Sequence, residues 1–245
     1  MDATFLALLV AHLVGDFPLQ PGWMIRRKRH PAVLALHGVV VVGVAAVALG
    51  GWPAPLLLIL VGTHLAMDAI KVYLLPDSLS SFTLDQVVHL GVILALSLAY
   101  PHAAAHGWWA QLPGDWAAAF RVALVLLGGV IASLMVGEIA IRKATAPFTG
   151  QLTGDISGLE SGGTYIGWLE RALVMLLILI GQPAGVGFLI TAKSILRFGD
   201  VRDSSQRKLT EYIIIGTFMS FGWGLLIAVL TQLALRHWMP GLQAQ

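Results

Sequence analysis

The sequence contains no cysteine and has few charged residues for its length. The lack of cysteine excludes disulfides, thiolate metal ligands and cysteine nucleophiles. Charged residues make up 11% of the 245 residues, whereas an ordinary soluble domain carries roughly 25%. So few charges cannot cover the surface of a soluble domain of this size. Disorder is excluded as well, because disordered chains are polar and highly charged.

The N-terminus lacks the features of a cleaved secretory signal. It reads MDATFLALLVAHLVGDF, which begins with an acid and has neither a basic segment nor a small-residue cleavage site. We therefore expect a retained first helix. The formal net charge is only +2, and no basic face is interleaved with aromatic residues, so nucleic acid is not expected as a partner.

Hydrophobic residues are what the chain has in excess. They reach 57% of the sequence, and the mean hydropathy is +0.81. A membrane-spanning helix needs about 20 mostly apolar residues, and segments of about this kind recur between Gly- and Pro-rich breaks. The fold class is therefore an all-α polytopic transmembrane bundle of about eight spans, whose oligomeric state the sequence leaves open. The expected spans are 3–19, 31–49, 53–75, 83–100, 117–141, 165–180, 183–198 and 209–233.

Basic residues in the short loops predict the orientation of these spans. The first loop contains the run 26–29, Arg-Arg-Lys-Arg, and the positive-inside rule places such a loop in the cytoplasm. With eight spans both termini are then outside, and all but Arg121 and Arg236 of the 15 Lys and Arg residues fall at cytoplasmic ends. We expect two regions, a five-helix region 1–141 and a three-helix region 142–245, joined by an inner loop from Arg142 to Thr164.

Ionisable residues lie inside the first four predicted spans, where each charge costs about 2.5 to 3.5 kcal/mol on insertion scales. Three pairs are spaced one helical turn apart, which puts both members on one face. At about 1.5 Å per residue the set lies at a common level near the cytoplasmic ends. These residues are His12, Asp16, His37, His64, Asp68, Asp85 and His89.

This set offers nitrogen and oxygen ligands without a thiol, which suits Zn, Mn, Fe or Mg. Zn and Mn are the ions we expect, either as two ions sharing a carboxylate or as one ion with supporting His–Asp pairs. Asp16, Asp68 or Asp85 could act as a general base. Lys71 lies one turn beyond Asp68 and could bind a phosphate or a developing oxyanion. The alternative is a metal-free network that handles protons or fixes helix packing.

A second polar cluster is expected near the cytoplasmic ends of the last three spans. Snorkelling side chains and salt bridges explain charges at helix ends. The functional alternatives are an anionic headgroup site or additional metal ligands. The cluster consists of Glu170, Arg171, Lys193, Arg197 and Glu211.

Four motifs occur in order: AHLVGDFPLQ from Ala11 to Gln20, then His37, then HLAMDAIK from His64 to Lys71, then DQVVH from Asp85 to His89. Over roughly residues 5–100 this order resembles an uncharacterised family of bacterial inner-membrane proteins of unknown function. The stretch from Tyr165 to Arg171, with later basic residues, is similar to the C-terminal extension of longer members. More distantly, the His-xxx-Asp helices resemble membrane-bound metal-dependent hydrolases of bacteria. The resemblance implies residence in the inner membrane and metal-assisted hydrolysis.

Three functions remain open from the sequence. A hydrolase would take a lipid, a lipid phosphate or a similar amphiphile from the inner leaflet. A metal-ion or proton-coupled transporter would need polar groups that continue to the outer side, but the outer halves, such as VVVVGVAAVALG, are almost wholly apolar. A non-catalytic scaffold would use the polar cluster only for packing. We favour the hydrolase, with membrane lipids as its surroundings.

Overall fold

The computed structural model describes residues 1–113, 115–152, 161–197 and 207–239, except the side chains of residues 196 and 197. Within these ranges the chain is helical and contains no strand, which confirms the predicted all-α class. The α-helices are α1 (Asp2–Asp16), α2 (Gly22–Arg27), α3 (Pro31–Leu49), α4 (Ala54–Leu74), α5 (Leu79–Ala99), α6 (Trp116–Ile131), α7 (Gly137–Thr149), α8 (Gly162–Leu179), α9 (Ala184–Arg197) and α10 (Arg207–Trp238).

Each of the eight predicted spans corresponds to a helical segment. Six segments are long and apolar enough to cross a membrane: α3, α4, α5, the continuous segment Trp116–Thr149, α8 and α10. The other two, α1 and α9, contain 15 and 14 residues, fewer than the roughly 20 that a full crossing needs. The expected number of spans is therefore approximate, although the positions of the helices follow the sequence pattern.

Local sequence signals account for several helix ends. Pro31 starts α3, and the side chain of His30 caps it by accepting a hydrogen bond from the Ala32 amide at 3.3 Å. Gly50 ends the same helix in the left-handed conformation, at φ 76°, which glycine adopts without steric cost. Ser78 caps α5 by accepting from the Ser81 amide at 3.2 Å.

The largest difference between a predicted and an observed helix end is at the end of α7. The inner loop was expected to begin at Arg142, but α7 continues through Pro147 to Thr149. The basic residues at 142 and 143 therefore lie on a helix rather than in a loop. Short 3₁₀ turns, η1 (Ala104–His106) and η2 (Trp108–Gln111), and a π-helical turn, η3 (Ala132–Val136), were also not expected.

The chain divides into two compact units. The N-terminal unit comprises Met1–Ile131 together with residues from Leu235 onward, and the C-terminal unit comprises Ala132–Ala234. The expected regions 1–141 and 142–245 remain a prediction, because compactness alone does not show which segments fold independently.

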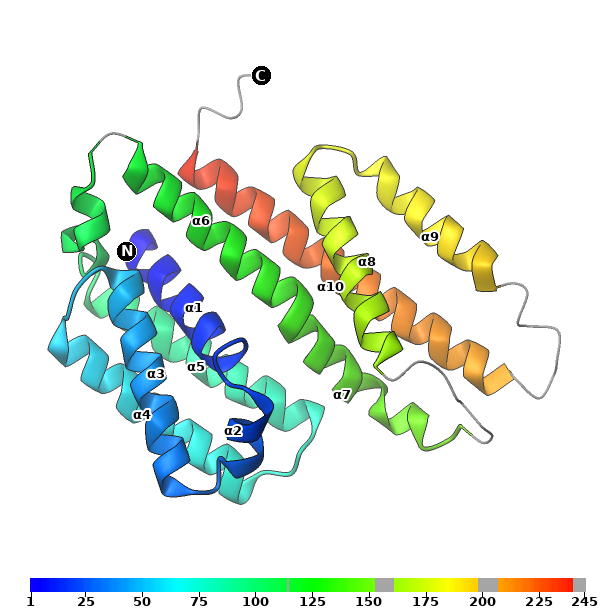
Figure 1. Ribbon diagram of the computed structural model, residues 1–245, viewed down its shortest axis with the longest axis horizontal. Coiled ribbons are helices and arrows are strands. Elements are labelled where there is room, and N and C mark those ends of the chain that lie inside the picture. Colours follow the sequence, from blue (N-terminus) through cyan, green and yellow to red (C-terminus); the bar gives the residue numbers. More distant parts are fainter. Residues whose placement is uncertain (114, 153–160, 198–206, 240–245) are drawn as a thin grey trace. The chain divides into compact units, whose positions relative to one another are not determined.

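In the N-terminal unit, α1 packs against α3, α5 and α6, while α4 packs against α3 and α5 (Figure 1). One half of this bundle is a dry apolar core that includes Leu8, Val41, Leu57 and Ile93. The 3₁₀ turns close the apolar end, where the indole of Trp109 donates to the Ala48 carbonyl at 3.0 Å. The buried histidines and aspartates of α1, α3, α4 and α5 all lie in the other half.

In the C-terminal unit, α8 packs against η3, α7 and α9 (Figure 1). Its apolar core includes Val174, Met175 and Phe221. The indole of Trp223 donates to the Ala132 carbonyl at 2.9 Å, at the π-helical turn. That turn disrupts the regular bonding of the helix, and such turns occur frequently at functional sites.

Candidate metal centre

Four helices deliver seven imidazole and carboxylate side chains to one place in the N-terminal unit. His12 and Asp16 come from α1, His37 from α3, His64 and Asp68 from α4, and Asp85 and His89 from α5. Their side chains are 8% exposed or less. Each pair spaced by four residues is in contact, with a nitrogen–oxygen distance of 3.5 Å in all three pairs.

Four ligand atoms converge at the centre of this cluster, namely Nε2 of His37, Nε2 of His64, Oδ1 of Asp16 and Oδ2 of Asp68. The two nitrogens are 3.0 Å apart. Oδ1 of Asp16 lies 3.3 and 3.2 Å from them, and Oδ2 of Asp68 lies 3.4 and 3.5 Å from them. A tetrahedral zinc ion with bonds of about 2.0 to 2.1 Å separates its ligands by about 3.3 Å. The nitrogen–nitrogen separation and the four nitrogen–oxygen separations are close to this value.

The hydrogen bonding at this centre leaves acceptors without donors. Oδ1 of Asp16 and Oδ2 of Asp68 are buried, and neither receives a well-directed hydrogen bond. The two imidazole nitrogens face each other, so at most one of them can carry a proton without a clash. A buried acceptor without a partner costs free energy, and a bound cation would supply the missing partner. His37, His64 and Asp68 together form a group that could hold a metal ion.

A second group of possible ligands consists of His12, Asp16, His64 and His89. The ring of His89 lies 5.0 Å from that of His12 and 4.3 Å from that of His64. These three imidazoles line a cavity of about 10 Å³, which has room for about one water molecule. Both ring nitrogens of His89 lack a hydrogen-bond partner.

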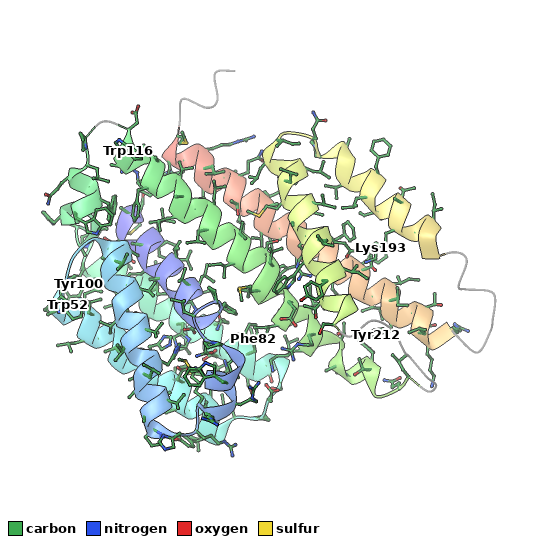
Figure 2. All side chains as sticks on the ribbon, in the orientation of Figure 1. Trp52, Phe82, Tyr100, Trp116, Lys193 and Tyr212 are labelled. Carbon is green, nitrogen blue, oxygen red and sulfur yellow. The ribbon has the colours of Figure 1, made fainter. Side chains whose placement is uncertain are left out.

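Two lysines pair with the carboxylates. Lys28 Nζ donates to Oδ1 of Asp68 at 2.6 Å, and Lys71 Nζ donates to Oδ2 of Asp85 at 2.5 Å. Lys71 also lies 5.6 Å from the ring centroid of Phe82, which is labelled in Figure 2. The sequence predicted that Lys71 could bind a phosphate or a developing oxyanion, which stays a prediction; in the structure it neutralises Asp85 and is 31% exposed.

Sequence reasoning missed Lys28, Gln20 and Gln86. Lys28 was counted among the loop residues, but α2 carries it back over the cluster, where it is buried. Gln20 Nε2 lies 3.1 Å from Nε2 of His37, and Gln86 Oε1 lies 3.3 Å from Nε2 of His12. The available signals were weak: Gln86 adjoins Asp85, and Gln20 follows the Asp16 motif.

The charges of the cluster do not balance. Three carboxylates face two lysines, so the described residues carry one net negative charge when all four imidazoles are neutral. Uncompensated charge is costly in a low-dielectric interior. A bound cation or one protonated imidazole must therefore accompany this arrangement.

The second predicted cluster is only partly assembled. Glu170, Arg171 and Lys193 line one cavity of the C-terminal unit. Glu211 is exposed and pairs with Arg207 at 3.0 Å. Arg197 ends α9, but its side chain lies outside the described part of the chain.

Residues 4–111 match a family described as a protein of unknown function (DUF3307). All seven residues of the cluster and both of its lysines fall within this range, which is consistent with the predicted resemblance to an uncharacterised family. No curated protein and no solved structure matches the chain. The resemblance to membrane-bound hydrolases therefore stays a prediction.

Proposed function

We propose that the N-terminal unit is a membrane-embedded metal-binding centre, with Asp16, His37, His64 and Asp68 as ligands. The observation that carries this proposal is that Nε2 of His37 and Nε2 of His64, 3.0 Å apart, each lie 3.2 to 3.5 Å from one carboxylate oxygen of Asp16 and one of Asp68. Zinc suits four nitrogen and oxygen ligands at this spacing. Manganese is the second choice, because it prefers more ligands and more oxygen.

We further propose that the centre hydrolyses a lipid phosphate or a similar amphiphile. A bound ion would activate water and polarise a phosphoryl oxygen. His89 is suited to be the general base, because both of its ring nitrogens lack a hydrogen-bond partner and Oδ1 of Asp85 lies 3.5 Å from its Nδ1. It also lines the water-sized cavity. Asp85 would then position His89, and Lys71 would hold Asp85.

The distribution of polar groups supports access from one side. On α1, α3, α4 and α5 the cluster residues occupy one half, and the buried core of the other half is apolar. A transporter needs a polar path through the membrane, and the described residues of this unit do not supply one. We propose residence in the bacterial inner membrane with both termini outside, which places the cluster toward the cytoplasm.

Metal analysis of the purified full-length protein tests the metal site. After supplementation with Zn or Mn, the protein should retain one first-row metal ion per chain or two. His64→Ala and Asp68→Asn should lose the metal yet still unfold cooperatively. His102→Ala is the matched control, because His102 is exposed and outside the cluster, and it should retain the metal. A well-folded wild type that retains neither ion would contradict the proposal.

Phosphate release from short-chain lipid phosphates in detergent tests the reaction. The metal-loaded wild type should release phosphate, and His89→Gln should keep the ion held by His37, His64 and Asp68 but lose turnover by about 100-fold or more. Metal retention without turnover on any such substrate would show a scaffold with a structural ion. Ion flux in proteoliposomes without hydrolysis would show a transporter.

A further inference from the structure

The C-terminal unit contains a cavity of about 390 Å³, within the range of volumes that small-molecule sites occupy. Its walls come from α7, α8, α9 and α10, and all of its lining residues lie between 138 and 220. Lys193 on α9 and Tyr212 on α10 both line it and are labelled in Figure 2. The metal centre of the N-terminal unit shares no residue with this cavity.

The charged residues that line the cavity leave one cation without an acid. Glu170 pairs with Lys193, and Glu138 pairs with Arg142 at 3.0 Å. Arg171 is the fifth charged residue, and no described carboxylate lies within ion-pair distance of it. Arg171 is only 3% exposed, and a guanidinium does not lose its proton in proteins. Burying such a charge is expensive, and Glu138 and Glu170 attract it only from beyond ion-pair distance.

Two hydrogen bonds hold the guanidinium of Arg171 in place, but they do not use all of its N–H donors. Its Nη1 donates to the hydroxyl of Ser220 and its Nη2 to the carbonyl of Leu134, both at 3.0 Å. A guanidinium has five N–H donors, and the buried Nε has no partner. At Gly167 a methyl group would lie 3.0 Å from Nη1, so a glycine there gives the guanidinium the space that it occupies.

We propose that this cavity binds the phosphate ester group of an anionic amphiphile, with Arg171 as its counter-ion. One net positive charge fits the single negative charge of a phosphodiester. The hydroxyls of Thr145, Thr164 and Thr217 offer further hydrogen bonds on the cavity wall, and Ile166 and Ile213 offer apolar surface. This proposal does not depend on the metal centre, so either can fail without the other.

A pair of glycines in α10 provides a test that leaves Arg171 intact. Gly216 lines the cavity, Gly222 does not, and a methyl group at either position would meet nothing within 4 Å. Gly216→Leu should fill part of the cavity without destabilising the helix, since leucine is the better helix former. Gly222→Leu adds the same side chain outside the cavity and is the matched control.

The probes are short-chain phosphatidylglycerol, short-chain phosphatidylcholine and glycerophosphoglycerol, titrated into delipidated full-length protein in a neutral detergent. Tryptophan fluorescence and thermal unfolding report binding. We expect phosphatidylglycerol to bind at least about tenfold more tightly than phosphatidylcholine, because both lipids carry the phosphodiester anion but the choline cation would add a positive charge to a cavity that already has one in excess. Gly216→Leu should lose this binding, and Gly222→Leu should keep it.

The soluble headgroup distinguishes the two sources of the phosphate ester. If glycerophosphoglycerol displaces phosphatidylglycerol from the cavity, the ligand is a soluble phosphodiester. If glycerophosphoglycerol does not displace it, the ligand is the lipid. Arg171→Gln should abolish the preference for phosphatidylglycerol, whereas Lys208→Gln, which removes an exposed charge outside the cavity, should not. Equal binding of both lipids, or unchanged binding by Gly216→Leu, would overturn the proposal even if Arg171→Gln fails to fold.

Discussion

Replacing Lys28 by methionine should destabilise the metal-free protein much more than the metal-loaded protein. Lys28 Nζ lies 2.6 Å from Oδ1 of Asp68, and the two side chains are 9% and 1% exposed. Methionine keeps most of the apolar stem and removes the charge. In the metal-free protein the substitution leaves Asp68 buried without its cation.

The size of the effect follows from that burial. Removing one partner of a buried ion pair costs about 3 to 5 kcal/mol. When an ion occupies the site, Asp68 keeps a counter-charge through Oδ2, so the cost should fall by at least about 1.4 kcal/mol. By linkage, the metal affinity of Lys28→Met should then rise by the same factor, about tenfold.

The assay measures chemical or thermal unfolding in detergent with and without Zn, and metal affinity by competition with a chelator. Lys71→Met is the matched control: Lys71 holds Asp85, which is not one of the four converging ligands, and its side chain is 31% exposed. Its effect on stability should be smaller because solvent screens the pair, and its effect on metal affinity should be small. The reasoning would be refuted if Lys28→Met lowered the stability of the protein equally with and without Zn and left the metal affinity unchanged.

Two further predictions concern the apolar end of the N-terminal unit. Gly50→Ala should destabilise the fold by about 1 to 3 kcal/mol in thermal unfolding, because φ of Gly50 is 76° and the added methyl would lie 2.6 Å from Cδ1 of Trp109. Gly51→Ala is the control: its added methyl meets nothing within 4 Å, so the same assay should show no change in stability. Thr4→Val should cost about 1 to 3 kcal/mol in that assay, because Oγ1 of the buried Thr4 accepts from the Ala104 amide at 3.2 Å. A cost near zero would contradict this account.

The sequence predicted the helices well because hydrophobic length is a local signal. The expected segment 31–49 coincides with α3, where Pro31 and Gly50 mark both ends. The prediction was wrong where a charged residue was interpreted as the end of a helix. Arg142 suggested a loop, yet α7 continues to Thr149, because a basic side chain at a helix end can extend toward the polar boundary.

For the side chains of the site, the sequence predicted only their depth in the membrane and the helix face on which they lie. One-turn spacing was enough to group His64 with Asp68. It could not show that Nε2 of His37 lies 3.0 Å from that of His64, since this distance depends on how α3 and α4 pack. The role of Lys28 could not be predicted for a different reason. A basic residue in a short loop is explained by the positive-inside rule alone, and only the path of α2 brings Lys28 to Asp68.

Both units contain a charge imbalance that the described residues do not resolve by themselves. In the cluster of the N-terminal unit the carboxylates exceed the lysines by one, so the missing partner is a bound cation or a proton on one imidazole. In the cavity of the C-terminal unit Arg171 exceeds the acids by one, so the missing partner is an anion. Buried unpaired charge is expensive near or within a bilayer, so each imbalance costs free energy until a partner of opposite charge is present. The sign of the excess charge therefore indicates which class of ligand each unit would bind, before any substrate is known.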